Sequence, residues 1–71
     1  SIMKRGHVES SNIESIGYDS KSQTLEIEFL NGTIYQYFDV PETVFEEFMG
    51  ADSHGKYLNA NIKGTYRYSK V

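Results

Sequence analysis

The 71-residue sequence predicts a small α+β domain, in which an antiparallel sheet of about three strands with a central hairpin is packed by two short helices. Residues 24–30 alternate apolar and acidic side chains, with the period of two that is typical of a half-buried strand. Residues 44–49 place apolar side chains on one helical face, and Gly50 follows as a stop. Because no repeat, linker or low-complexity segment interrupts the chain, we expect residues 1–71 to form one domain.

Two β elements are expected in the first forty residues. A short strand over residues 13–18 follows a polar segment and ends at a polar reversal over residues 19–22. A hairpin over residues 24–40 comes next, because Asn31 and Gly32 tolerate positive φ between two segments of strand-forming residues. One face of the first hairpin strand is apolar and the other is acidic.

The length of the hairpin loop decides where Tyr35 and Tyr37 point. A two-residue loop at 31–32 would place both tyrosines opposite the glutamates of the preceding strand, on the outer face. A three-residue loop at 30–32, with Gly32 in a left-handed bulge, would place them beside the apolar residues of that strand. We favour the three-residue loop.

Helical signals fill the second half of the chain. Pro41 suits the first position of a helix that ends before Gly50. Asp52 or Ser53 can cap a second helix that runs to about Lys63, where a glycine ends it. The remaining residues alternate tyrosine with polar side chains, which predicts a short final strand or an extended arm.

The charges are divided unevenly along the chain. All ten carboxylates lie in residues 1–52, together with three basic residues, whereas residues 53–71 hold four basic residues and no acidic one. Tyrosines interleave with those four cations, a combination that suits phosphates and stacked bases. The six candidate RNA-binding residues are Lys56, Lys63, Tyr66, Arg67, Tyr68 and Lys70. In the structural alternative, the lysine at the end of the second helix complements the helix dipole and the tyrosines pack under the sheet.

Several short motifs follow one another along the chain: Ser10-Ser11-Asn12-Ile13, Ile16-Gly17-Tyr18, Leu25-Glu26-Ile27-Glu28-Phe29, Tyr35-Gln36-Tyr37, Val40-Pro41, Gly55-Lys56-Tyr57 and Ile62-Lys63. From about Met3 to Lys70, the chain thereby resembles the KTSC domain, a family named for its occurrence at the C-terminus of some lysyl-tRNA synthetases and also found as stand-alone small bacterial proteins. The Y-x-Y hallmark of that family falls on Tyr35 and Tyr37, whereas Leu58 stands where a phenylalanine is expected. The resemblance implies a fold and little chemistry, and it makes RNA or a neighbouring protein the expected partner.

Tyr35 and Tyr37 could stack two bases on an open sheet face or fill the core with their hydroxyls at its margin. We favour the core, because a chain of this size has only one small core and large rings must fill much of it. The second functional hypothesis is a protein-interaction surface at Ile34 and Phe38, which the three-residue loop would leave partly exposed.

Other chemistry is not expected from this sequence. Without cysteine or a Ser/His/Asp arrangement, we expect no enzyme activity, cofactor or small-molecule substrate. His7 and His54 lack metal-ligand spacing, and residues 53–56 suit ordinary helix capping better than an anion cradle. Paired glutamates such as 26/28 and 46/47 are expected to be solvated faces. Because there is no membrane span or signal segment, we expect the protein in the cytoplasm.

Overall fold

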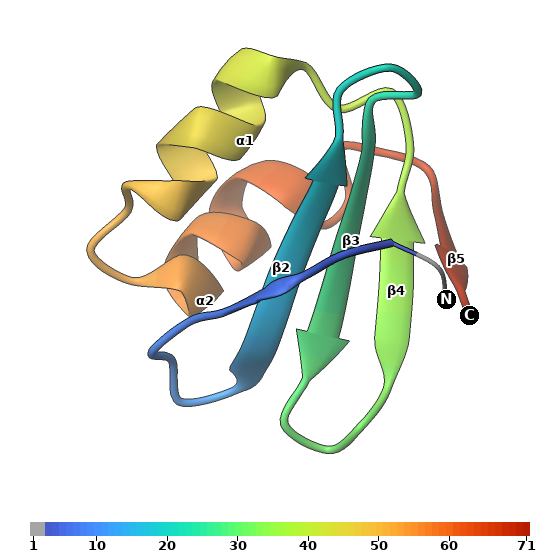
Figure 1. Ribbon diagram of the computed structural model, residues 1–71. Coiled ribbons are helices and arrows are strands. Elements are labelled where there is room, and N and C mark those ends of the chain that lie inside the picture. Colours follow the sequence, from blue (N-terminus) through green and yellow to red (C-terminus); the bar gives the residue numbers. More distant parts are fainter. Residues whose placement is uncertain (1–2) are drawn as a thin grey trace.

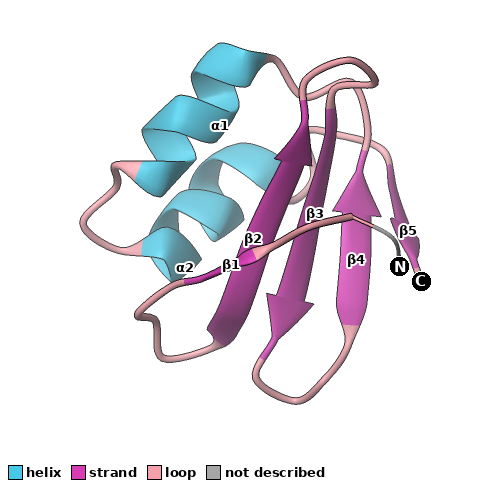
Figure 2. Cartoon of the chain, viewed as in Figure 1, coloured by secondary structure: helices cyan, strands magenta, loops and turns pink. Residues whose placement is uncertain are grey.

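The computed structural model describes residues 3–71, so Ser1 and Ile2 lie outside it. The described chain forms a five-stranded antiparallel sheet with two helical segments on one face, while the N-terminal segment crosses the other face (Figures 1 and 2). The elements, in chain order, are β1 (Gly6–His7), β2 (Ile13–Asp19), β3 (Thr24–Phe29), β4 (Ile34–Tyr37), α1 (Glu42–Met49), α2 (His54–Tyr57), η1 (Leu58–Ile62) and β5 (Tyr68–Lys70). The strand order is β1-β2-β3-β4-β5, and the helices connect β4 to β5.

The prediction of about three strands was wrong, although the fold class is confirmed. The extra strands are β1 and β5, at the two edges of the sheet. β1 has only two residues and carries no periodicity that a sequence pattern could show. The alternation after Gly64 predicted a short final strand or an extended arm, and the pairing of β5 with β4 makes it a strand.

The hairpin of β3 and β4 has the three-residue loop that we favoured. Gly32 in this loop has a φ of +90°, which is accessible to glycine and strained for most other residues. Tyr35 consequently pairs with Ile27, and Tyr37 with Leu25. Both tyrosines therefore lie on the apolar inner face, which is the face that the helices cover.

The core forms between this inner face and the helices. Phe48 of α1 and Leu58 and Ile62 of η1 are at most 1% exposed, and they pack against apolar side chains of the sheet. A bulge between Ile13 and Ser15 of β2 shifts the register there. A single small core of this kind depends strongly on each large side chain.

The outer face of the sheet is not the solvated acidic surface that we expected. Glu26 on β3 is 0% exposed and accepts hydrogen bonds from Arg5 and from the amide of Gln36 at 2.8 Å. The Arg5 guanidinium also donates to the Ser15 hydroxyl at 3.0 Å and lies 3.7 Å from a carboxylate oxygen of Glu28. The N-terminal segment thus covers the carboxylate and compensates its charge.

The close crossing of this segment requires a glycine in β2. A Cβ on Gly17 would lie 2.4 Å from the backbone oxygen of Lys4 and 2.9 Å from Cγ of Arg5. Real Cβ atoms do not approach so closely, so any larger residue would lift the N-terminal segment from the sheet. Gly17 and the Arg5–Glu26 ion pair are consequently parts of the same contact.

The second helical segment begins as predicted and ends differently. The Ser53 hydroxyl accepts a hydrogen bond from the backbone N–H of Lys56 at 3.2 Å, which is ordinary N-capping. From Leu58 onward the turns widen into a π-helix, in which the N–H of Lys63 donates to the oxygen of Leu58 at 2.9 Å. The sequence predicted one continuous helix to this point and carried no signal for the wider turns.

Candidate functional site

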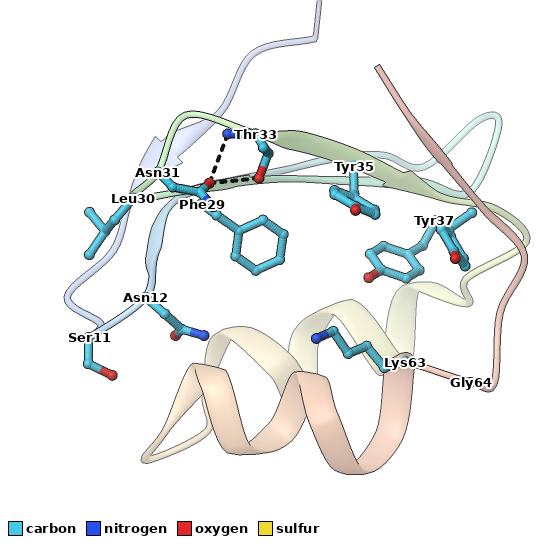
Figure 3. A pocket seen from close by; sticks show the side chains of 11 residues that line it. Ser11, Asn12, Phe29, Leu30, Asn31, Thr33, Tyr35, Tyr37, Lys63 and Gly64 are labelled. Atoms are coloured by element: carbon cyan, nitrogen blue, oxygen red, sulfur yellow. Dashed lines mark hydrogen bonds between the residues drawn. The ribbon is translucent and has the colours of Figure 1, made fainter.

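An open groove lies between the inner face of the sheet and the end of η1, next to the β3–β4 loop (Figure 3). Its volume is about 840 Å³, within the range of small-ligand sites. One wall is aromatic and comes from β3, β4 and β5. The other boundary is polar and includes Asn12, before β2, and Lys63, after η1.

The aromatic wall consists of Phe29, Tyr35, Tyr37 and Tyr68. The ring centres of the three tyrosines lie 5.6 to 6.5 Å apart, and Phe29 meets Tyr35 edge-on at 5.8 Å. Tyr37 is 2% exposed and Tyr35 half-buried, whereas Tyr68 on the edge strand is 61% exposed. The exposure of the rings therefore increases from Tyr37 in the core to Tyr68 at the sheet edge, and Tyr68 offers the most accessible of the three tyrosine rings for stacking.

Burial raises the pKa of Tyr37 above that of free tyrosine, and the negative charges that Tyr35 and Tyr68 would carry if ionised raise it further. The Tyr37 hydroxyl therefore stays protonated and neutral at physiological pH. It adds no negative charge to the wall.

Two of the predicted cations lie on the same side of the sheet as these rings. Lys63 lines the groove, and Figure 3 shows its side chain extending from the end of the helix into the space below the sheet. Lys70 pairs with Tyr35, and Tyr68 pairs with Tyr37, so both β5 side chains share the inner face with their partners. Both lysines are exposed and free to meet an anion.

The other three predicted residues lie elsewhere. Arg67 forms an ion pair with Asp39 at 2.8 Å, and its guanidinium lies 5.4 Å from the ring centre of Phe38, away from the groove. Tyr66 packs against the core. Lys56 is exposed on α2 and does not line the groove. The tail residues therefore divide into a groove group and a dispersed group.

The electrostatics of the groove differ from those of the whole chain. The net charge of the protein is −3, but no carboxylate lines the groove. Glu26 and Glu28 lie on the opposite face of the sheet, where Arg5 partly compensates them. The groove thus combines one cation, Lys63, with aromatic rings and has no acidic residue among those that line it.

Sequence reasoning missed Asn12 as a residue of this site. Asn12 lies in a polar segment whose sequence indicates only a turn. Most of its neighbours in the groove come from distant parts of the chain, so no local pattern connects it to the site. Among residues 3–71, no group of three or more His, Cys, Asp or Glu side chains could hold a metal ion. No helix formed by the described part of the chain is long and apolar enough to cross a membrane.

The fold and the groove define a class of small α+β modules with an aromatic inner sheet face. The chain belongs to the KTSC domain family, which matches residues 9–71. The crystal structure of a KTSC domain protein from Yersinia pestis is similar with a TM-score of 0.92 and 44% sequence identity, covering 97% of each chain.

Relatives known by sequence are of two kinds. An uncharacterized protein of Stutzerimonas stutzeri is 41% identical over 70 residues, which are 97% of this chain and 99% of that protein. The lysine–tRNA ligase of Trichormus variabilis is 44% identical over 63 residues, which are 89% of this chain and 11% of the ligase. The family therefore includes both a small protein of similar length and a segment of a much larger enzyme.

Proposed function

We propose that this KTSC domain is a non-catalytic cytoplasmic module that binds single-stranded RNA in the groove between the sheet and η1. The observation that carries the proposal is the meeting of exposed Tyr68 with Lys63 and Lys70 on one face that no carboxylate lines. Rings accept stacked bases and ammonium groups hold phosphates, a pairing that single-strand binders use.

The relatives support RNA as the class of ligand. A segment similar to almost the whole chain occurs within a lysine–tRNA ligase, a protein whose name refers to tRNA. A domain joined to such an enzyme has an RNA molecule within reach, so a groove of this kind in that domain could contact the RNA.

The test is a titration with a short single-stranded RNA at several salt concentrations. With Lys63 and Lys70 on phosphates, log K should fall with log salt at a slope of about −1.4. Replacing Lys63 by Gln should weaken binding and make the slope shallower by about 0.7. Lys21→Gln removes the same charge from the exposed β2–β3 turn and is the matched control, which should leave the slope unchanged.

Backbone amide signals of β5 and of the β3–β4 loop should shift in NMR spectra as RNA is added. Binding that is insensitive to salt, or equal effects of the Lys63 and Lys21 replacements, would contradict a phosphate contact in the groove. Absence of binding at low salt would remove the proposal altogether.

The second candidate function, a protein-interaction surface at Ile34 and Phe38, has weaker support. Both side chains are half-buried, and the Arg67 guanidinium lies over the Phe38 ring. Partner-induced shifts centred on these two residues, without shifts in the groove, would favour it over RNA binding.

A further inference from the structure

The side chain of Asn12 lies at the polar end of the groove, where it contacts Ser10 and approaches Gly55. Its Oδ1 accepts a hydrogen bond from the Ser10 hydroxyl at 3.1 Å, and its backbone oxygen accepts one from the Leu30 N–H at 2.9 Å. A Cβ on Gly55 would lie 2.9 Å from this Oδ1, so a larger residue at this position would require the amide to shift. The Ser10 hydroxyl and Gly55 thus limit the orientation of the amide, and the bond from Leu30 anchors the backbone that carries it.

With its oxygen engaged, the Asn12 amide faces the groove as a donor. The nitrogen Nδ2 has no acceptor among residues 3–71. Figure 3 shows this nitrogen and the ammonium of Lys63 pointing into the groove from opposite sides, below the ring of Phe29. Two donors, one of them charged, are therefore directed into the groove, and neither has a hydrogen-bond acceptor among residues 3–71.

Converging donors of this kind suit an anionic oxygen. A phosphate accepts hydrogen bonds on several oxygens, and a bond from a neutral donor to a charged acceptor is stronger than one between neutral groups. The tyrosine rings begin on the sheet above this point, so the groove offers a polar end and an aromatic end to one ligand.

We infer that Asn12 and Lys63 together bind a phosphate of the RNA chain, while the neighbouring base lies toward Tyr35 and Tyr68. This inference rests on the proposed function. It adds a phosphate subsite and thereby defines which end of the groove holds the phosphate and which end holds the base. Gly55 acts as a positioning residue, since it touches Asn12 and does not line the groove.

The test compares RNA affinity and its salt dependence among variants of the full chain. Asn12→Ala should lower the affinity about tenfold and leave the salt slope unchanged, because the amide carries no charge and releases no counterion. Lys63→Gln should change both quantities. Asn59→Ala removes an exposed asparagine of η1 that does not line the groove, and it should leave both unchanged.

Gly55→Ala should also weaken binding, because its new Cβ would displace the amide of Asn12. In the Asn12→Ala background the same replacement should have no further effect on affinity. The Asn12 side-chain NH₂ signal of the unmodified protein should shift on addition of RNA, and this measurement does not depend on how well any variant folds.

The possible outcomes distinguish a failure of the phosphate subsite from a failure of the proposed RNA binding. RNA binding with a normal salt slope, an unaffected Asn12→Ala variant and an unshifted Asn12 NH₂ signal would overturn the phosphate subsite and leave RNA binding intact. No RNA binding by the unmodified protein would overturn both.

Discussion

Arg5 is expected to contribute strongly to the stability of the fold, because it pairs with a buried carboxylate. Its side chain is 19% exposed, and its guanidinium pairs with Glu26, whose side chain is 0% exposed. Arg5→Met keeps an unbranched apolar chain over the sheet and removes the charge. Glu26 then remains buried, keeps the 2.8 Å bond from Gln36 and loses its ion pair with Arg5.

The expected cost follows from this geometry. Removing one partner of a buried ion pair typically costs about 3–5 kcal/mol, and the remaining bond from Gln36 favours the lower end of that range. A domain of 71 residues has a free energy of unfolding of about 4–10 kcal/mol, so the variant should lose a third or more of it. The midpoint of thermal unfolding should fall by about 12–24 °C.

The assay is urea and thermal unfolding followed by circular dichroism, arranged as a double-mutant cycle with Glu26→Gln. In the Glu26→Gln background no buried charge is left, so Arg5→Met should cost about 2 kcal/mol less than in the unmodified protein. Lys4→Met removes a neighbouring exposed charge and should change stability by less than about 0.5 kcal/mol. Additive effects of the Arg5 and Glu26 replacements, within about 0.5 kcal/mol, would refute the reasoning.

Two further predictions concern the folded state. Gly17→Ala should lower the free energy of unfolding, measured by urea titration, by about 1–3 kcal/mol, because its Cβ would lie 2.4 Å from the Lys4 oxygen. Gly6→Ala is the control and should not show this loss, since the space around its Cβ is open. Burial and the hydrogen bond to Glu47 raise the pKa of Tyr57 to about 12. Tyrosine in the unfolded chain ionises near pH 10, so the stability that the neutral Tyr57 hydroxyl contributes is complete below pH 10. It should be lost as the pH rises toward 12. Tyr57→Phe should flatten that decline in urea titrations between pH 9 and pH 12, and an unchanged decline would contradict the assignment.

The elements of the core fold follow from local patterns in the sequence. Alternation identified β3, the Asn31-Gly32 pair identified the hairpin loop, and Ser53 capped the helix where it was expected. These signals are local because each depends on side chains within a few residues of one another. The same patterns could not show β1, which has two residues and is placed by its pairing with Ser15 and Ile16 of β2.

The candidate site could be predicted in part. Charge segregation indicated the C-terminal segment, and Lys63, Tyr68 and Lys70 do share one face. Alternation in a strand also implies that Arg67 and Tyr68 point to opposite sides, but it does not say which side faces the helices. The pairing of β5 with β4 decides that, and it leaves Arg67 beside Asp39.

By itself, the sequence indicated the family and the order of the main elements, and it favoured the inward direction of the Y-x-Y tyrosines without excluding the outer face. Only the tertiary structure decided that Glu26 is buried beneath Arg5 and that Asn12 rests against Gly55 at the edge of a groove. The physical reason is that helix and strand periodicities describe neighbours within a few residues, whereas burial and donor orientation depend on atoms brought together from segments far apart in the chain.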